Sequence, residues 1–220
     1  MSRTASSFAG RSGACVFLVL MAVACGTSDT PSDTSSAVAA PPAGTTYLTT
    51  EFVPKLEVTV PAWLPHEPSA DEPNFLTWIG EGVWVDRAVR FLVPVNLYEP
   101  GSATASAPPA NYLAYLAYLR TQDQHGAQFT DETTVTVGGR PATVMTATTT
   151  TSLDGSLGCP ADGIPAAGCF GLQPELTLRI AIIDATNTTL LAWARAITGT
   201  ADAAQEFADF ERMLATVQFR

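Results

Sequence analysis

The segment TTVTVGGRPATVMTATT, residues 133–149, carries the clearest fold signal in the chain. On its first arm Val135 and Val137 alternate with threonines, which is the period of a strand with one buried face. Gly138 and Gly139 follow, and glycine tolerates the positive φ angles of a tight two-residue turn. The segment therefore predicts an antiparallel hairpin.

Strand-like segments lie on both sides of this hairpin. Residues 176–183 and 188–197 predict a second hairpin, whose first arm is apolar enough to be a central strand. Upstream, a first antiparallel cluster is predicted from residues 56–60, 75–79 and 88–95. Strands joined mainly by hairpins favour an antiparallel sheet over a parallel doubly wound one.

Two segments change to the helical period. Residues 110–122 contain neither Gly nor Pro and place Tyr112 and Tyr115 on one face with two leucines. Residues 202–217 have the pattern of an amphipathic closing helix. We therefore expect an α+β fold, a mostly antiparallel sheet of about seven strands covered by two helices.

The start of the chain has the pattern of an export signal, residues 1–24. Arg3 and Arg11 give it a basic beginning, and an apolar run of about a dozen residues follows, shorter than the roughly 20 that a membrane-spanning helix needs. The run ends in AVAC, which resembles the lipobox of bacterial lipoproteins, with Ala22 in place of the usual leucine. The resemblance implies a lipid on Cys25 that holds the protein at the outer face of the cell membrane. Ordinary signal cleavage and secretion as a soluble protein is the alternative.

Residues 25–46 consist mainly of Gly, Ser, Thr, Asp, Pro and Ala. Such a segment buries too little apolar surface to offset the entropy of ordering its backbone. It predicts a flexible tether, followed by a single domain over residues 47–220.

The charge balance excludes one class of partner. The chain has 11 basic and 21 acidic side chains, and removal of Arg3 and Arg11 with the signal leaves 9 basic against 21 acidic, a net charge of −12. Nucleic acid and anionic lipid surfaces repel such a chain. We expect no nucleic-acid partner.

Four cysteines divide by position. Cys15 lies in the signal, Cys25 is the lipidation candidate, and Cys159 and Cys169 remain. In an oxidising compartment the remaining two most simply form a disulfide. The rival, a zinc site, lacks ligands because no histidine is near.

The longest excursion between predicted strands is residues 153–174, and loops of about 20 residues are usually functional or disordered. A disulfide argues against disorder. As a hypothesis, Ile164 and Phe170 of this loop form a partner-binding surface with Tyr112 and Tyr115. The alternatives are a strap over one end of the sheet and, for the tyrosines, core packing.

No catalytic, metal-binding or cofactor-binding residue is predicted. His66 and His125 lie in loop-like sequence, and Ser156 is not in a Gly-x-Ser-x-Gly motif. The acidic pairs Asp71-Glu72 and Asp131-Glu132 are interpreted as solvated loops. An envelope hydrolase using Ser156 and His125, and a carrier of a small apolar ligand between sheet and helix, stay as alternatives.

One resemblance covers most of the domain. The opening F-x-P-x-L-x-V-T-V-P-A-W, residues 52–63, and the order of elements resemble exported lipoproteins of high-GC Gram-positive bacteria, some of which have a PsbP-like α/β/α sandwich. The photosystem subunits that name that fold bind protein partners. The resemblance implies a non-enzymatic domain that binds a protein or another envelope component.

Overall fold

The computed structural model describes residues 44–80 and 87–220. The predicted signal, Cys25 and almost all of the predicted tether lie outside the described residues. Within the described part, no helix is long and apolar enough to cross a membrane.

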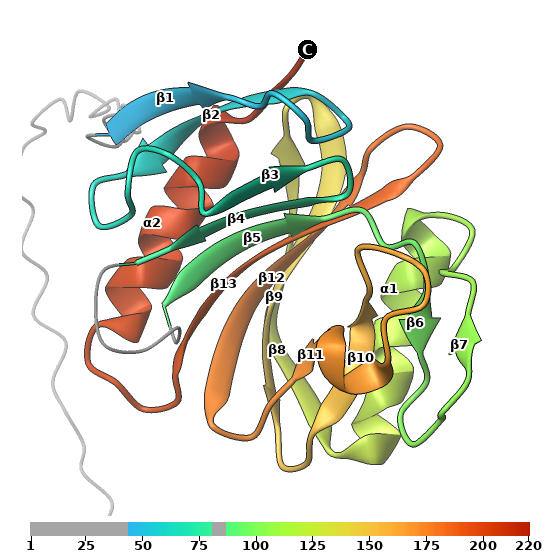
Figure 1. Ribbon diagram of the computed structural model, residues 1–220. Helices are drawn as coiled ribbons and strands as arrows, with labels where there is room; N and C mark the ends of the chain where they lie inside the picture. Colours follow the sequence, from blue (N-terminus) through green and yellow to red (C-terminus); the bar gives the residue numbers. More distant parts are fainter. Residues whose placement is uncertain (1–43, 81–86) are drawn as a thin grey trace, which may run out of the picture. The chain divides into compact units, whose positions relative to one another are not determined.

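A seven-stranded sheet forms the centre of the domain, and every neighbouring pair of its strands is antiparallel (Figure 1). The predicted fold class, an α+β fold with a seven-stranded antiparallel sheet and two helices, is confirmed. In spatial order the strands are β3 (Ala70–Glu72), β4 (Phe75–Ile79), β5 (Ala88–Leu92), β13 (Thr189–Ile197), β12 (Leu176–Asp184), β9 (Arg140–Thr149) and β8 (Ala127–Val137).

The hairpin of residues 133–149 is confirmed as part of β8 and β9. Gly138 and Gly139 have φ angles of 56° and 79°, as its turn requires. The strand β12 lies inside the sheet between β13 and β9, as its apolar sequence indicated.

The predicted first cluster is only partly correct. Strand β2 (Leu56–Pro61) does not pair with β4 or β5, and lies between β1 (Gly44–Leu48) and β14 (Gln218–Phe219) in a separate three-stranded sheet. The seventh strand of the main sheet is instead β3, whose three residues are too few to show a period. The strand β1 also begins inside the predicted tether, because Gly44 already pairs with Pro61.

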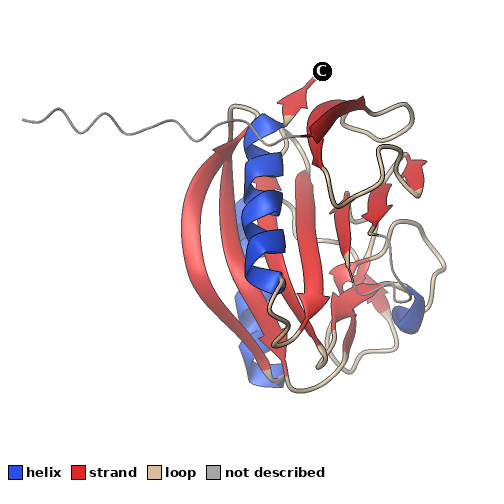
Figure 2. Ribbon diagram, turned by 90° about the vertical axis from the view of Figure 1, so that its left-hand side faces the viewer, coloured by secondary structure: helices blue, strands red, loops and turns tan. Residues whose placement is uncertain are grey.

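One helix covers each face of the main sheet. Side chains alternate between faces along a strand, so the apolar residues divide into two cores. The helix α2 (Ala203–Thr216) packs with one core, which includes Phe91 and Ile183. The helix α1 (Tyr112–Thr121) packs with the other, which includes Ile182 and Trp193. Figure 2 shows α2 lying along its face of the sheet.

The predicted loop of residues 153–174 has its own secondary structure and is called here the strapped excursion. It contains β10 (Leu153–Gly158), the short 3-10 helix η2 (Ala166–Gly168) and β11 (Phe170–Leu172), and β10 pairs with β11. Its apolar residues belong to the same core as the buried residues of α1. Figure 1 shows the excursion beside α1. The remaining elements are two short strands and a 3-10 helix, β6 (Leu97–Tyr98), β7 (Ala105–Ser106) and η1 (Gln122–His125).

Candidate functional site

A cavity of about 210 Å³ lies between the main sheet and the strapped excursion. Arg90 and Arg195 line it from the sheet, together with Trp193, and Phe170 lines it from the excursion. We call it the two-arginine pocket.

The register of two neighbouring strands brings the arginines together. Trp193 of β13 lies opposite Arg90 of β5, and Arg195 follows two residues later on β13. Residues two apart on a strand point to the same face. The two basic side chains and the indole therefore share the face that carries α1 and the excursion.

Arg90 is held in a setting that disfavours its charge. Burial, and then the positive charge of Arg195, lower the pKa of Arg90 to about 9. Its Nε atom is buried and has no hydrogen-bond partner. Among residues 44–80 and 87–220, no carboxylate forms an ion pair with Arg90.

Aromatic rings build the wall beside Arg90. Its guanidinium lies over the ring of Phe170, 5.1 Å from the centroid. Phe170 stacks on Phe75 with a centroid separation of 4.8 Å and meets Trp193 edge-on at 5.3 Å. The disulfide between Cys159 and Cys169 fixes the chain next to Phe170, so the predicted bridge is present and secures one wall.

Gln173 lines the same pocket, but its amide is already engaged. Its Nε2 donates to Asp154 Oδ1 at 2.8 Å, and its Oε1 accepts from the hydroxyl of Ser152 at 2.9 Å. Hydrogen bonds from Ser152 and Gln173 hold the pKa of Asp154 below its usual value. Two guanidinium groups in an aromatic-lined cavity are suited to binding an anion.

One residue of the predicted surface of Tyr112, Tyr115, Ile164 and Phe170 lies in the core. Tyr115 is fully buried and its hydroxyl donates to the carbonyl of Leu157, so its assignment to a partner surface is wrong and core packing is correct. Tyr112 is half-buried and hydrogen-bonds with Thr143. Of the four residues, Phe170 lines the two-arginine pocket.

In the described part of the chain, Ser156 and His125 do not form the catalytic arrangement that the hydrolase alternative requires. Ser156 is fully buried, and its hydroxyl has no hydrogen-bond partner. His125 is exposed at the end of η1. His66 is also exposed, and its Nδ1 lies 2.9 Å from Glu67 Oε1. In the described ranges, no group of three or more His, Cys, Asp or Glu residues could hold a metal ion.

The interpretation of Asp71-Glu72 and Asp131-Glu132 as loop residues is wrong, since the first pair lies in β3 and the second in β8. The carboxylate of Asp71 accepts hydrogen bonds from the hydroxyl of Tyr47 at 2.8 Å and from the backbone N–H groups of Thr50 and Phe52 at 2.6 and 2.8 Å. These bonds fasten the segment after β1 to the edge of the main sheet, which is a structural role.

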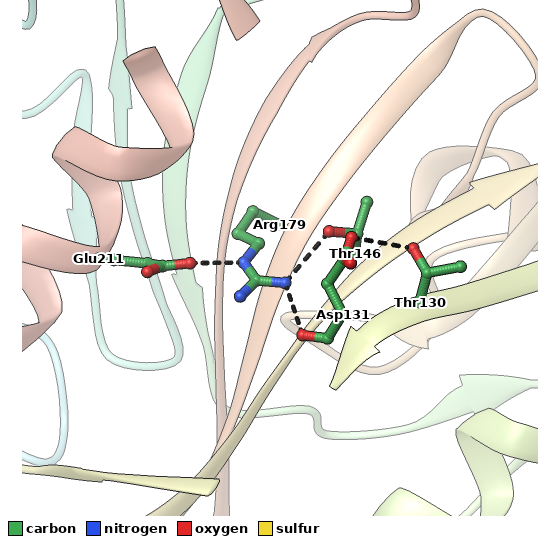
Figure 3. A network of polar contacts seen from close by, with 5 residues as sticks. All are labelled: Thr130, Asp131, Thr146, Arg179 and Glu211. Atoms are coloured by element: carbon green, nitrogen blue, oxygen red, sulfur yellow. Dashed lines mark hydrogen bonds and ion pairs between the residues drawn. The ribbon is translucent and has the colours of Figure 1, made fainter. Parts of the chain in front are cut away.

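Arg179 is buried and lies on the opposite face of the sheet, and Figure 3 shows its contacts. Its Nε donates to Glu211 of α2 at 2.7 Å, and its Nη1 donates at 3.1 Å to Thr146 Oγ1 and to the carbonyl of Asp131. Asp131 has a φ of 52° at an irregularity in the β8 ladder. Arg179 thus joins β12 to α2 and to β8 through its Nε and Nη1 atoms, whereas Arg90 Nε has no hydrogen-bond partner.

Comparison with known proteins gives a similarity of fold alone. The sequence matches no family model and no curated protein. Among solved structures, cyanobacterial PsbP from Synechocystis sp. PCC 6803 is 10% identical, with a TM-score of 0.42, and the match covers 87% of this chain and 100% of that one. A Pseudomonas aeruginosa protein of unknown function is 14% identical, with a TM-score of 0.40 and coverage of 80% and 99%. A Bacteroides thetaiotaomicron protein is 13% identical, with a TM-score of 0.39. That match covers 75% of this chain and 45% of the Bacteroides chain.

Proposed function

We propose that this chain is an exported lipoprotein whose domain binds an anionic envelope component without catalysing a reaction. A lipid on Cys25 would hold it at the outer face of the cell membrane. The basic start, the apolar run and the AVAC sequence of the first 25 residues support the export and the anchor.

The observation that carries the binding function is the two-arginine pocket. Two like charges share one cavity, and Arg90 pairs with no carboxylate in the described parts of the chain. A bound anion would offset the positive charge of the pocket and form charge-assisted hydrogen bonds with Arg90. Perturbed charges in an aromatic-lined cavity are typical of functional sites.

Binding is tested by isothermal titration of the purified protein with acetate, benzoate, phosphate and sulfate. We expect at least one of these anions to bind saturably at one site, and Arg90→Met to weaken that binding at least tenfold. Arg120→Met is the matched control, because Arg120 forms an exposed pair with Glu132 on another part of the domain. If none of the four anions bound, or if Arg90→Met bound as well as the wild type, the pocket would not be the binding site.

The anchor is tested by growing cells that express the full chain with labelled palmitate and separating their membranes. We expect label in the wild-type protein and in a Cys15→Ser variant, whose change lies in the signal. We expect neither label nor membrane retention in Cys25→Ser. An unlabelled wild-type protein, or a Cys25→Ser protein that stays in the membrane, would contradict lipid anchoring.

A further inference from the structure

We infer that the free edge of β8 is a second binding surface, at which a basic, extended segment of a partner protein adds to the main sheet as a further strand. The contact lies along Thr133–Val137, which we call the open edge. The irregularity between Thr130 and Thr133 bounds it on one side and the turn after Val137 on the other. It is separate from the two-arginine pocket, because the groove beside it lies on the α2 face of the sheet.

The two edges of the main sheet differ. At the β3 edge, the backbone N–H groups of Thr50 and Phe52 donate to the carboxylate of Asp71, and that of Val53 donates to the carbonyl of Pro73 at 2.9 Å. The β8 edge is eleven residues long, and no strand in the described ranges pairs with its outer side. Such an edge presents unpaired backbone groups with which another chain can pair.

The turn of the hairpin determines which backbone groups point outward. Val137 and Arg140 flank the two-residue turn and form its hydrogen-bonded closing pair. Bonded and non-bonded pairs alternate along an antiparallel ladder, so Thr136 and Thr134 belong to non-bonded pairs. Pro141 lies opposite Thr136 and has no N–H to donate, which agrees with this assignment. The N–H and C=O groups of Thr134 and Thr136 therefore point to the open edge.

An apolar groove of about 170 Å³ follows the open edge, between β8 and α2. Val135 and Ala215 line it and are both exposed, Val135 to 37%, and Leu214 lies beneath them. Side chains of an added strand would alternate between the two faces of the sheet. Every second side chain would therefore lie over the groove, where a small apolar one is favoured.

The charges around the open edge favour a basic partner. Asp131 and Glu132 precede it in β8, and Glu211 lines the groove, all three exposed. The basic side chains that pair with them are Arg120 and the buried Arg179. Outside the predicted signal, acidic side chains outnumber basic ones by more than two to one. A basic segment is attracted by this field, whereas a second copy of the chain would be repelled.

The test is a two-dimensional ¹H–¹⁵N NMR titration of the purified protein with a seven-residue peptide of alternating lysine and valine, blocked at both ends. We expect the backbone N–H signals of Thr134 and Thr136 to shift and to saturate at one equivalent of bound peptide. We also expect amide hydrogen exchange at these two residues to slow at least tenfold at saturation, because their N–H groups gain partners.

Three further peptides separate the contributions. With valines over the groove, the lysine amides face β8 and the valine amides face away. N-methylation of the lysine amides should therefore abolish binding, and N-methylation of the valine amides should leave most of it. A peptide of alternating glutamate and valine should bind at least tenfold more weakly, because its charge matches that of the protein.

Variants locate the surface. We expect Val135→Ser to weaken binding of the lysine–valine peptide at least fivefold, because it removes apolar contact at the groove. Leu113→Ser is the matched control, since Leu113 is 68% exposed on α1. Arg90→Met should bind the peptide like the wild type, because the two-arginine pocket is a different site.

Other outcomes would overturn the inference. Peptide binding that leaves the Thr134 and Thr136 signals in place, or that survives Val135→Ser, would place the site elsewhere. Equal binding of the glutamate–valine peptide would exclude charge as the basis of selection. A dimer in sedimentation equilibrium, with Thr134 and Thr136 signals that shift with protein concentration alone, would replace the partner segment by a second copy of the chain.

Discussion

Arg90 opposes the stability of the ligand-free domain, because burial and the charge of Arg195 both disfavour its guanidinium. We expect Arg90→Met to raise the free energy of unfolding by about 1 kcal/mol while it weakens anion binding at least tenfold, as for a residue kept for function at a cost in stability. Urea denaturation without ligand measures the change. Arg120→Met, at a half-exposed ion pair, should stay within about 0.5 kcal/mol of the wild type. An Arg90→Met protein less stable than the wild type would show that Arg90 is structural.

Asp71 gives the domain a predictable acid sensitivity. Burial raises its pKa, but the bonds from the backbone of Thr50 and Phe52 and from the hydroxyls of Tyr47 and Thr50 outweigh burial, so the pKa lies below the usual 3.8. A carboxyl whose pKa is lowered by folding adds stability that is fully present well above pH 3.8 and is lost as the pH falls through the folded-state pKa.

We therefore expect Asp71→Ala to lower the free energy of unfolding by about 2 kcal/mol at pH 7. The difference from the wild type should shrink as the pH falls below about 4. Urea denaturation at pH 7, 5, 4 and 3 measures both effects. The neighbouring Glu72→Ala is the control, since Glu72 is exposed. A difference independent of pH would mean that the charge of Asp71 does not contribute.

At the scale of elements, the strapped excursion connects the disulfide to the pocket. Phe170 directly follows Cys169 and packs against Phe75 and Trp193. A bridge that closes a loop of this length stabilises by about 2–3 kcal/mol in the chain-entropy model. We expect Cys159→Ser/Cys169→Ser to lose about that much stability and to bind the tightest-binding of the four anions several-fold more weakly. Guanidinium chloride denaturation and titration calorimetry measure the two effects. An unchanged affinity would show that the disulfide does not support the pocket.

The contacts of Arg179 make a prediction for β8. Arg179→Met removes the donors to Asp131, Thr146 and Glu211, and we expect it to cost about 2 kcal/mol of stability. Amide hydrogen exchange should accelerate in the irregular part of β8, near Asp131. Glu211→Gln is the control, because glutamine keeps an oxygen that can accept from Arg179, and it should have a smaller effect. Equal exchange in wild type and Arg179→Met would contradict this role.

The elements that were predictable from sequence are those whose pattern is local. The hairpin through Gly138 and Gly139 needs only alternation and a turn, and α2 needs only its apolar face. Strand β2 was placed with the wrong partners because β14, at the far end of the chain, pairs with it, and the sequence of β2 carries no mark of that partner. In β10, Gly155 has a φ of 73° and lies against the ring of Tyr98, so a glycine typical of loops serves a close contact in a strand.

At the scale of the whole molecule, the site could not be read from the sequence because strands distant in the chain assemble it. Arg90 and Arg195 are brought together by the pairing of β5 with β13, and Phe170 arrives from the excursion. A local signal existed, since both arginines interrupt apolar strands, in AVRFL and in TLLAWARAI. The strand order was needed to show that the two arginines lie on neighbouring strands and on one face of the sheet. The disulfide, by contrast, followed from the count and position of the cysteines.

The central claim, that the two-arginine pocket is the anion-binding site, is tested most directly by a two-dimensional ¹H–¹⁵N NMR titration of the purified protein with the tightest-binding of acetate, benzoate, phosphate and sulfate. The side-chain N–H signals of Arg90 and Trp193 identify the pocket, and Arg90→Met and Trp193→Phe spectra assign them. We expect both signals to shift together and to saturate at one equivalent of bound ligand, while the N–H signals of Arg120 stay in place. Shifts confined to Arg120 or other exposed arginines, with Arg90 and Trp193 unchanged, would contradict the claim.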